Sequence, residues 1–342
     1  MQARASARRA CEPSHLALFT VLVLLLVVAG ATLVPSVVSA QRKEPVRIGV
    51  LTDGWGPTPA TVGLRDGLQA FGYRESEHFD IGIRFTQGDV GALPTAAREL
   101  LAAGSGIIFA TSTNAARAAQ QATKVTPIVF GEVSGDPVKL GLVRSFARPG
   151  GNITGVSTLA IELTSKRLEL FKELVPGLKR VLFVYDPSDS DGVTAAEAHR
   201  EASRQLGLVL VEKTPRSQEE ARDVITRVRR SEVDGIVASP SGMALNIPGA
   251  VLETASRQQV PTMFNAAFWV ERGALAGYGP DFYESGRQAA RLVVKILKGE
   301  KPEAIPVETN SRIEFVINVK VAKALKLELG LALLRRADRL IE

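Results

Sequence analysis

From residue 46 onward, short apolar runs alternate with longer segments whose apolar residues recur at helical spacing. The runs predict strands at 46–51, 79–85, 106–110 and 127–131, and the longer segments predict helices at 61–72, 92–104 and 114–123. Strands that alternate with helices of ten or more residues indicate βαβ units and a parallel sheet. The runs are almost continuously apolar, as is typical of strands covered on both faces.

The same alternation starts again after a glycine-rich stretch, "ARPGGNITGVS" (147–157). The second block has predicted helices at 161–177, 195–207, 217–230 and 246–259, and predicted strands at 180–185, 208–213, 234–239 and 260–265. Pro149 fixes the direction of entry into the stretch, and Gly150 and Gly151 take backbone angles that other residues avoid. An ordinary helix-ending turn would have the same composition. The repeated pattern on either side favours a passage between two α/β lobes.

The first 40 residues have a different character. Three arginines precede an uncharged, mostly apolar run from Leu16 to Val34, and the small residues "SVVSA" follow Pro35. This is the pattern of a secretory signal peptide, with Val38 and Ala40 at the positions that a signal peptidase recognises. We expect cleavage after Ala40. An uncleaved membrane anchor is the alternative, since the run is long enough to span a bilayer.

Composition limits the chemistry of the mature chain. Cys11 is the only cysteine and precedes the cleavage site, so neither a disulfide nor a cysteine metal site forms after cleavage. The chain has a net charge of +6, and loss of three Arg and one Glu with the signal peptide lowers it to +4. The densest basic cluster, "RVRR" (227–230), lies on a helical pattern, where a solvated helix face explains it better than nucleic-acid binding does.

Catalytic motifs are missing from the sequence. The three histidines are His15 in the signal peptide, His78 in a polar loop and His199, which we expect on the exposed side of a helix. No phosphate-binding loop, zinc-protease motif or serine-hydrolase elbow is present. The aspartates of "DPSDSD" (186–191) do not match a calcium-loop pattern, so we expect turns and a helix cap there. We therefore expect neither an enzyme nor a bound metal or other cofactor.

Three long motifs resemble the periplasmic substrate-binding proteins of ABC transporters, in the branch that includes proteins for aromatic amino acids. They are "DPVKLGLVRSFARPGGNITGVS", "GYGPDFYESGRQAARLVVKILKGEKPEAIPVE" and the tail "FVINVKVAKALKLEL...LLRRADRLIE". Their order matches that family, and the likeness extends from about Val46 to Glu342. The resemblance implies two Rossmann-like lobes of the periplasmic binding protein type I kind, joined by a hinge of several crossings, with the ligand held between the lobes.

The sequence suggests where those crossings lie. The three candidates are the glycine-rich segments 150–155 and 273–279 and the segment 298–306. The expected hinge glycines are Gly150, Gly151, Gly155, Gly277 and Gly279. The expected first lobe is then 46–152 with 281–299, which includes a helix at 282–297. The expected second lobe is 153–280 with 300–342.

Polar residues at the carboxyl ends of the predicted strands are the candidate ligand-binding residues, because ligands of open α/β sheets bind there. In the first lobe they are Thr52, Asp53, Trp55, Thr111, Ser112, Thr113, Asn114 and Glu132. In the second lobe they are Tyr185, Ser188, Ser239, Ser241, Asn265 and Tyr278. Each of these polar side chains is equally suited to cap a helix.

We expect a ligand carboxylate to meet Thr111, Thr113 and the free amides at the start of helix 114–123. A ligand ammonium would need Asp53 or Glu132. Trp55 is equally suited to shield a ligand and to pack between the lobes.

The function most consistent with these features is the extracytoplasmic solute-binding component of an ABC importer. It would be a periplasmic monomer that captures a small polar solute, such as an amino acid or another carboxylate, and delivers it to an inner-membrane permease. The alternatives are an extracytoplasmic two-lobed enzyme and a ligand sensor that signals to a membrane receptor. The effector-binding half of a repressor shares the fold, but a signal peptide stands where its DNA-binding helices would be.

Overall fold

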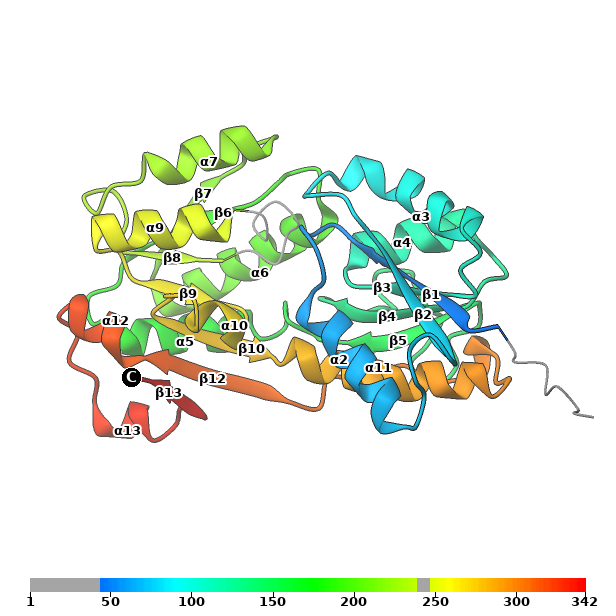
Figure 1. Cartoon of the computed structure of the whole chain (residues 1–342). Helices are drawn as coiled ribbons and strands as arrows, with labels where there is room; N and C mark the ends of the chain where they lie inside the picture. Colours follow the sequence, from blue (N-terminus) through cyan, green and yellow to red (C-terminus); the bar gives the residue numbers. More distant parts are fainter. Residues whose placement is uncertain (1–43, 239–246) are drawn as a thin grey trace, which may run out of the picture. The chain divides into compact units, whose positions relative to one another are not determined.

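Two β-sheets organise the described part of the chain, and helices cover both faces of each sheet (Figure 1). The computed structural model describes residues 44–238 and 247–342. The expected signal peptide lies outside the described residues, and so do two expected site residues, Ser239 and Ser241. Among the helices of the described ranges, none combines the length and the apolar character that a membrane span requires.

The first sheet contains parallel strands in the order β11-β5-β4-β3-β1-β2. Its strands are β1 (Val46–Thr52), β2 (Phe79–Phe85), β3 (Ile107–Ala110), β4 (Ile128–Val133), β5 (Ile153–Ser157) and β11 (Glu308–Thr309). The helices that pack on it are α2 (Pro59–Ala70), α3 (Leu93–Ala102), α4 (Thr113–Ala122) and α11 (Phe282–Leu297), with short 3₁₀ turns at Val90–Ala92 and Pro302–Ala304. We call this assembly the first lobe.

Alternate residues of these strands face two separate cores, as the period of a β-strand requires. Val50 and Phe109 pack with the residues of α2 and α11 on one face. Leu51 and Phe130 pack with the residues of α3 and α4 on the other face. Because both faces are covered by helices, the strands are buried, as their continuous apolar sequence predicted.

Helix α11 is far from α2 in sequence, yet the two helices pack closely (Figure 1). A Cβ atom added to Gly63 would lie 2.0 Å from the carbonyl oxygen of Tyr283, and one added to Gly286 would lie 2.0 Å from that of Ala60. Glycine is therefore the residue that lets the two backbones approach so closely. Helix α11 is thereby part of the first lobe.

The second sheet has the order β13-β12-β10-β9-β8-β6-β7, in which all pairs are parallel except β10 with β12. Its strands are β6 (Arg180–Val184), β7 (Val209–Lys213), β8 (Gly235–Val237), β9 (Thr262–Phe264), β10 (Ala276–Pro280), β12 (Ile313–Asn318) and β13 (Arg339–Ile341). Its helices are α5 (Thr164–Leu174), α6 (Ser190–Leu206), α7 (Gln218–Thr226), α9 (Pro248–Gln258), α10 (Ala267–Val270), α12 (Val319–Ala324) and α13 (Leu331–Leu334). We call this assembly the second lobe.

The chain crosses between the lobes at places that differ from the expected ones. Strand β5 pairs with β4, so residues 153–157 belong to the first sheet and the first crossing follows at 158–163. The second crossing is the junction of β10 and α11 at Asp281. The third lies between β11 and β12, at 310–312, so the segment 300–309 also belongs to the first lobe. The strand pairing thus places these two crossings several residues after the expected boundaries at 152 and 299.

The expected hinge glycines serve other purposes. Gly150, with φ 75°, and Gly151 precede β5 within the first lobe, so they form a turn and not a crossing. Gly155 lies inside β5, and Gly277 and Gly279 lie inside β10. A Cβ on Gly279 would come within 1.9 Å of the Asn265 carbonyl oxygen. Glycine at that position is explained by the close approach of neighbouring backbones, and not by a need for backbone flexibility.

Candidate ligand-binding site

Three helices begin where the two lobes meet. Helices α2 and α4 of the first lobe follow β1 and β3, and α6 of the second lobe follows β6. The amide nitrogen Nδ2 of Asn114, in the first turn of α4, donates a hydrogen bond of 3.0 Å to Oδ1 of Asp189, the residue that caps α6. We define the lobe junction as Asp53, Thr111–Asn114 and Glu132 of the first lobe with Asp189–Asp191 of the second.

Asp53 directly follows β1, and its side chain is buried. Burial and, to a smaller extent, the nearby charge of Asp189 raise the pKa of this carboxyl to about 6. Hydrogen bonds from the side chains of Ser112 and Asn114 oppose that rise. Ser112 also caps α4 by accepting a hydrogen bond from the amide of Ala115. Asp53 is thus bonded to the start of α4 and lies close enough to the second lobe for the charge of Asp189 to act on it.

Asp191 lies in the first turn of α6 and is only 4% exposed. Burial is the main cause that raises the pKa of its carboxyl to about 7, and the charges of Asp189 and Asp53 add to the effect. The Thr113 hydroxyl of the first lobe, and at longer range the Arg117 guanidinium, partly lower this pKa. A carboxyl of the second lobe is therefore surrounded by groups of the first.

Glu132 occupies the end of β4. Burial raises the pKa of its carboxyl from 4.5 to about 8, with a smaller contribution from the charge of Asp53. The Thr58 hydroxyl donates a hydrogen bond of 2.7 Å to Oε1 of Glu132, and the amide of Ala60 also donates to this carboxyl. Glu132 therefore faces the N-terminus of α2. The positive end of the helix dipole favours the ionised form of Glu132, but the cost of burying that charge is larger, so the pKa stays raised.

Some buried polar atoms at the lobe junction have few hydrogen-bond partners among the described residues. Oγ1 of Thr111 and Oγ of Ser190 have none, and the Thr113 hydroxyl has none apart from the Asp191 carboxyl. Thr111 is 3% exposed and Thr113 is fully buried. A buried polar group without a partner costs about 1–3 kcal/mol. These buried atoms therefore retain hydrogen-bonding capacity that the described residues leave unused.

Some expected site residues lie away from this place. Tyr185 belongs to the core of the second lobe, where its ring stacks on Phe183, and its hydroxyl contacts Glu212 and Arg200 on the outer edge. The side chain of Ser188 is exposed and donates to Asp186 within a turn. The aromatic ring of Tyr185 and the hydroxyl of Ser188 are thus engaged within their own lobe.

The remaining expected residues have mixed positions. Thr52 is buried and its hydroxyl accepts a hydrogen bond from the amide of Gly54, which shapes the loop after β1. Trp55 in that loop is 55% exposed. Asn265 is buried at the end of β9, and the Tyr278 ring packs edge-on against Phe315. Of these four, Thr52 and Trp55 lie within two residues of Asp53 in the sequence.

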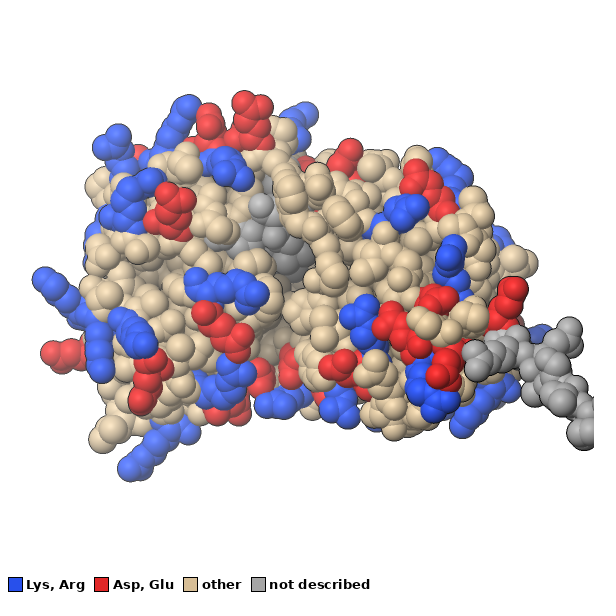
Figure 2. Space-filling model, viewed as in Figure 1, with Lys and Arg blue, Asp and Glu red and all other residues tan. Residues whose placement is uncertain are grey.

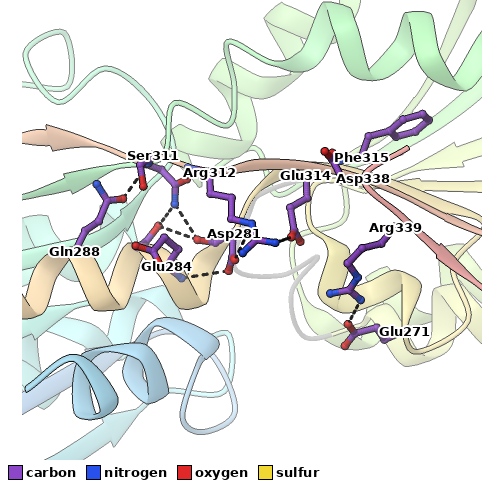
Figure 3. Close-up of polar contacts among 12 residues, drawn as sticks. Glu271, Asp281, Glu284, Gln288, Ser311, Arg312, Glu314, Phe315, Asp338 and Arg339 are labelled. Atoms are coloured by element: carbon purple, nitrogen blue, oxygen red, sulfur yellow. Dashed lines mark hydrogen bonds and ion pairs between the residues drawn. The ribbon is translucent and has the colours of Figure 1, made fainter. Parts of the chain in front are cut away.

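A second feature lies beside the later two crossings, where a cavity of about 270 Å³ is lined by charged residues. Arg312 lies between two acids, with Nη2 2.6 Å from Oε1 of Glu314 and Nε 3.8 Å from Oδ2 of Asp281 (Figure 3). Arg339 pairs with Glu271 at the same cavity. Two guanidinium groups thus face three carboxyl groups at this cavity, and the printed ion pairs engage all five within the protein.

Asp189 and Asp191 were interpreted as turn and cap residues, although Asp189 lies in the loop 185–190 that was expected to border the ligand. Asp189 does cap α6 by accepting from the amide of Asp191. Their additional position against the first lobe depends on how the lobes meet. The signal in the sequence was the density of aspartates in "DPSDSD" at the end of a predicted strand.

His199 also differs from expectation, since it is fully buried and not on an exposed helix face. Its ring stacks on Phe183 with centroids 4.2 Å apart, and Nδ1 lies 2.7 Å from the Ala195 carbonyl oxygen. Burial lowers the pKa of this imidazole to about 3. His199 is therefore a neutral core residue.

The described residues contain no group of side chains suited to bind a metal ion. Within 44–238 and 247–342, no three His, Cys, Asp or Glu side chains are grouped so as to hold a metal ion. Lysines, arginines and acidic residues are interspersed over the face of the molecule that Figure 2 shows.

Comparisons with known proteins give a consistent picture. The family model for "ABC transporter substrate binding protein" matches residues 26–341. The tyrosine-binding protein of Clostridioides difficile (strain R20291) is 28% identical over 290 residues, which cover 84% of this chain and 83% of that protein.

Two solved structures are similar over most of the chain. One is the ABC domain from Streptococcus pneumoniae in complex with L-Trp, with 28% identity, a TM-score of 0.76 and coverage of 87% of this chain and 100% of that one. The other is the ligand-free, open structure of a substrate binding protein with adhesive properties from Clostridium difficile, with 27% identity, a TM-score of 0.60 and coverage of 87% and 99%. They confirm the two-lobed fold of the periplasmic binding protein type I kind.

Proposed function

Because the chain belongs to the family of ABC transporter substrate binding proteins, we propose that it captures a small polar solute between its lobes and delivers it to an inner-membrane permease. Substrate-binding proteins are not enzymes, which agrees with the missing catalytic motifs. The chain would act in the periplasm, after cleavage of its signal peptide behind Ala40. It would act as a monomer, without nucleic acid.

The observation that carries this proposal is the lobe junction itself. Buried carboxyls and unpartnered hydroxyls face one another there from two separately cored lobes. They lie at the carboxyl ends of parallel strands, where open α/β sheets bind ligands. Capture between lobes exploits this arrangement because a ligand that contacts both sides stabilises their closed arrangement.

Three crossings at 158–163, 281 and 310–312 supply the hinge for such closure. The contact between Asn114 and Asp189 joins the two lobes directly, as expected of a closed form. The TM-score to the L-Trp complex, 0.76, exceeds the 0.60 to the ligand-free, open structure, in keeping with closure. In the open form these junction groups would be accessible to water and to ligand.

The ligand class follows from the carboxyls. The relatives are named for tyrosine or hold L-Trp, both of which carry an ammonium group. Asp53 and Glu132 in the first lobe, and Asp191 in the second, are the groups that would accept hydrogen bonds from an ammonium. Trp55 is placed to cover an apolar or cationic part of the solute.

A solute screen combined with small-angle scattering tests the proposal. Solutes that raise the melting temperature of the mature protein are identified first, and the radius of gyration is then measured with and without each one. We expect a smaller radius of gyration on saturation, as the lobes close. A stabilising solute that leaves the radius unchanged, and whose affinity is unaltered by Thr113→Val, would place binding elsewhere.

A further inference from the structure

Backbone hydrogen bonds connect the third crossing to each of the other two. The amide of Asn310 donates over 2.8 Å to the carbonyl oxygen of Ser157, directly before the first crossing, beside the pairing of β11 with β5. The amide of Asp281, at the second crossing, donates over 2.9 Å to the carbonyl oxygen of Arg312, beside the pairing of β10 with β12. The first crossing leads into helix α5 and not into a strand, so strand pairing does not connect it to the second crossing.

A side chain connects the first crossing to the second. Arg167 lies near the start of α5 and is 2% exposed. Its Nη2 donates a hydrogen bond of 3.0 Å to the carbonyl oxygen of Ala160 in the first crossing, and its Nε donates one of 2.9 Å to the carbonyl oxygen of Tyr278 in β10. Tyr278 is three residues before the second crossing. One planar guanidinium thus bridges the two segments.

The peptide group between Ala160 and Ile161 contacts both lobes. Its carbonyl oxygen accepts from Arg167 of the second lobe, and its N–H donates over 3.1 Å to the carbonyl oxygen of Ser134 in the first lobe. The preceding residue, Leu159, has a φ of 48°, in the left-handed region that bulky residues avoid. Such strain persists only where the surrounding structure holds it. The two hydrogen bonds on the next peptide group provide that restraint.

Burial makes the bonds of this guanidinium costly to break. Burial lowers the pKa of Arg167 to about 10, so the side chain stays charged at neutral pH. Both acceptors are carbonyl oxygens of the main chain. A buried cation has exchanged its hydration for such oxygens. A motion that separated Ala160 from Tyr278 would deprive the charge of one of them. Arg167 therefore resists independent movement of the first two crossings.

We infer that Arg167 is a positioning residue of the hinge, which ties the first crossing to the second so that all three crossings bend as one unit. The lobes then close along a single path, and the polar groups of the lobe junction meet in the same register each time. This inference rests on the hinge of the proposed function. It concerns the ligand-free chain, however, and is testable without a solute.

Distances between spin labels on the two lobes test the inference. Cys11 is the only cysteine, so the mature chain carries labels only where cysteines are introduced. Arg98→Cys in α3 and Arg222→Cys in α7 place one label at an exposed position of each lobe. Double electron–electron resonance then gives the distribution of distances between the lobes. In the ligand-free protein, Arg167→Met should widen this distribution about two-fold, because the first crossing moves independently.

Matched variants separate this role from a general loss of stability. Arg180→Met removes an ion pair with Asp234 at the start of β6 and should leave the width unchanged. Arg167→Lys keeps the charge but not the fork that reaches two carbonyl oxygens, so we expect it to be as wide as Arg167→Met. A wild-type width in Arg167→Met or in Arg167→Lys would overturn the inference, and so would equal widening in Arg180→Met.

Hydrogen exchange of the wild-type chain decides if Arg167→Met fails to fold. The amide of Ile161 should exchange as slowly as the amides of β4, because opening the first crossing alone requires the bonds of Arg167 to break. Much faster exchange at Ile161 would overturn the inference. Solute capture is judged separately. Absence of any stabilising solute in the screen would count against capture and leave the ligand-free comparison decisive for Arg167.

Discussion

Glu132→Gln should stabilise the ligand-free protein, although it removes a residue of the binding site. In the folded chain the pKa of this carboxyl is raised from 4.5 to about 8 by burial. At pH 7 the unfolded chain therefore carries an ionised carboxylate, whereas the folded chain must keep this group mostly protonated. At 1.36 kcal/mol per pH unit, the difference costs the folded state up to about 3 kcal/mol. Gln is nearly isosteric and keeps an oxygen that can accept from Thr58.

The sign of the pH dependence distinguishes this cause from a general packing effect. An acid with a raised folded pKa penalises folding only above its unfolded pKa. The penalty is therefore absent below about pH 4.5 and grows as the pH rises to about 8. We therefore expect the free energies of unfolding of wild type and Glu132→Gln to coincide near pH 4.5. They should then diverge by up to about 1.4 kcal/mol per pH unit and become parallel above pH 8.

Urea denaturation of the ligand-free protein at pH steps from 4.5 to 9 is the suitable assay. Because the side chain of Glu132 retains some contact with solvent, a gain of about 1–3 kcal/mol at pH 7 is the realistic range. Glu197→Gln, at an exposed position, is the control and should show no divergence. Glu132→Met tests whether an unsatisfied amide masks the effect in the Gln variant. Parallel curves for wild type and both Glu132 variants across the whole range would refute the reasoning.

Three further predictions concern the site, the fold and the N-terminus. Thr113→Val should lower the affinity for the solute found by screening about ten- to a hundred-fold, because a hydrogen bond to a charged group is lost. It should not lower the melting temperature of the ligand-free protein. Calorimetry measures the affinity, and thermal melts measure the melting temperature. Gly279→Ala should destabilise the protein by about 1–3 kcal/mol, because the added Cβ would collide with the backbone of Asn265. Gly151→Ala places its Cβ in open space and should change the free energy of unfolding by less than about 0.5 kcal/mol. The same urea titration measures both variants. Mass spectrometry of protein secreted to the periplasm should find Gln41 as the first residue, and a product that retains residues 1–40 would show that the segment is an anchor.

Local patterns predicted most of the elements correctly. Helix 282–297 and strand 79–85 have the bounds that the sequence indicated, because amphipathic spacing and continuous apolar runs are properties of the segment itself. Strand β5 was missed because "NITGVS" is short and follows two glycines, so its composition resembles that of a turn. Pairing with β4 overrides this local tendency, since β5 is buried along its whole length.

Site residues were harder to predict, because their roles depend on distant parts of the chain. Asp53, Thr113 and Asn114 follow strands, and strand ends are visible in a sequence. Asp191 becomes a site residue only through its position against a helix of the other lobe. Tyr185 was assigned to the site because it also ends a strand, but its ring lies on the core side, and a single residue at a strand end does not reveal which way it points.

The late position of α11 in the chain has a consequence for biosynthesis. The core between this helix and α2 takes Leu292 and Val293 from one and Leu64 and Leu68 from the other, and β11 completes the sheet only at Thr309. An emerging polypeptide therefore lacks part of the first lobe's interior until nearly all of it has been synthesised. Contacts between segments so far apart form slowly, because the intervening loop must close first. The sheet and the core of the first lobe therefore stay incomplete in the nascent chain until residue 309 has been synthesised.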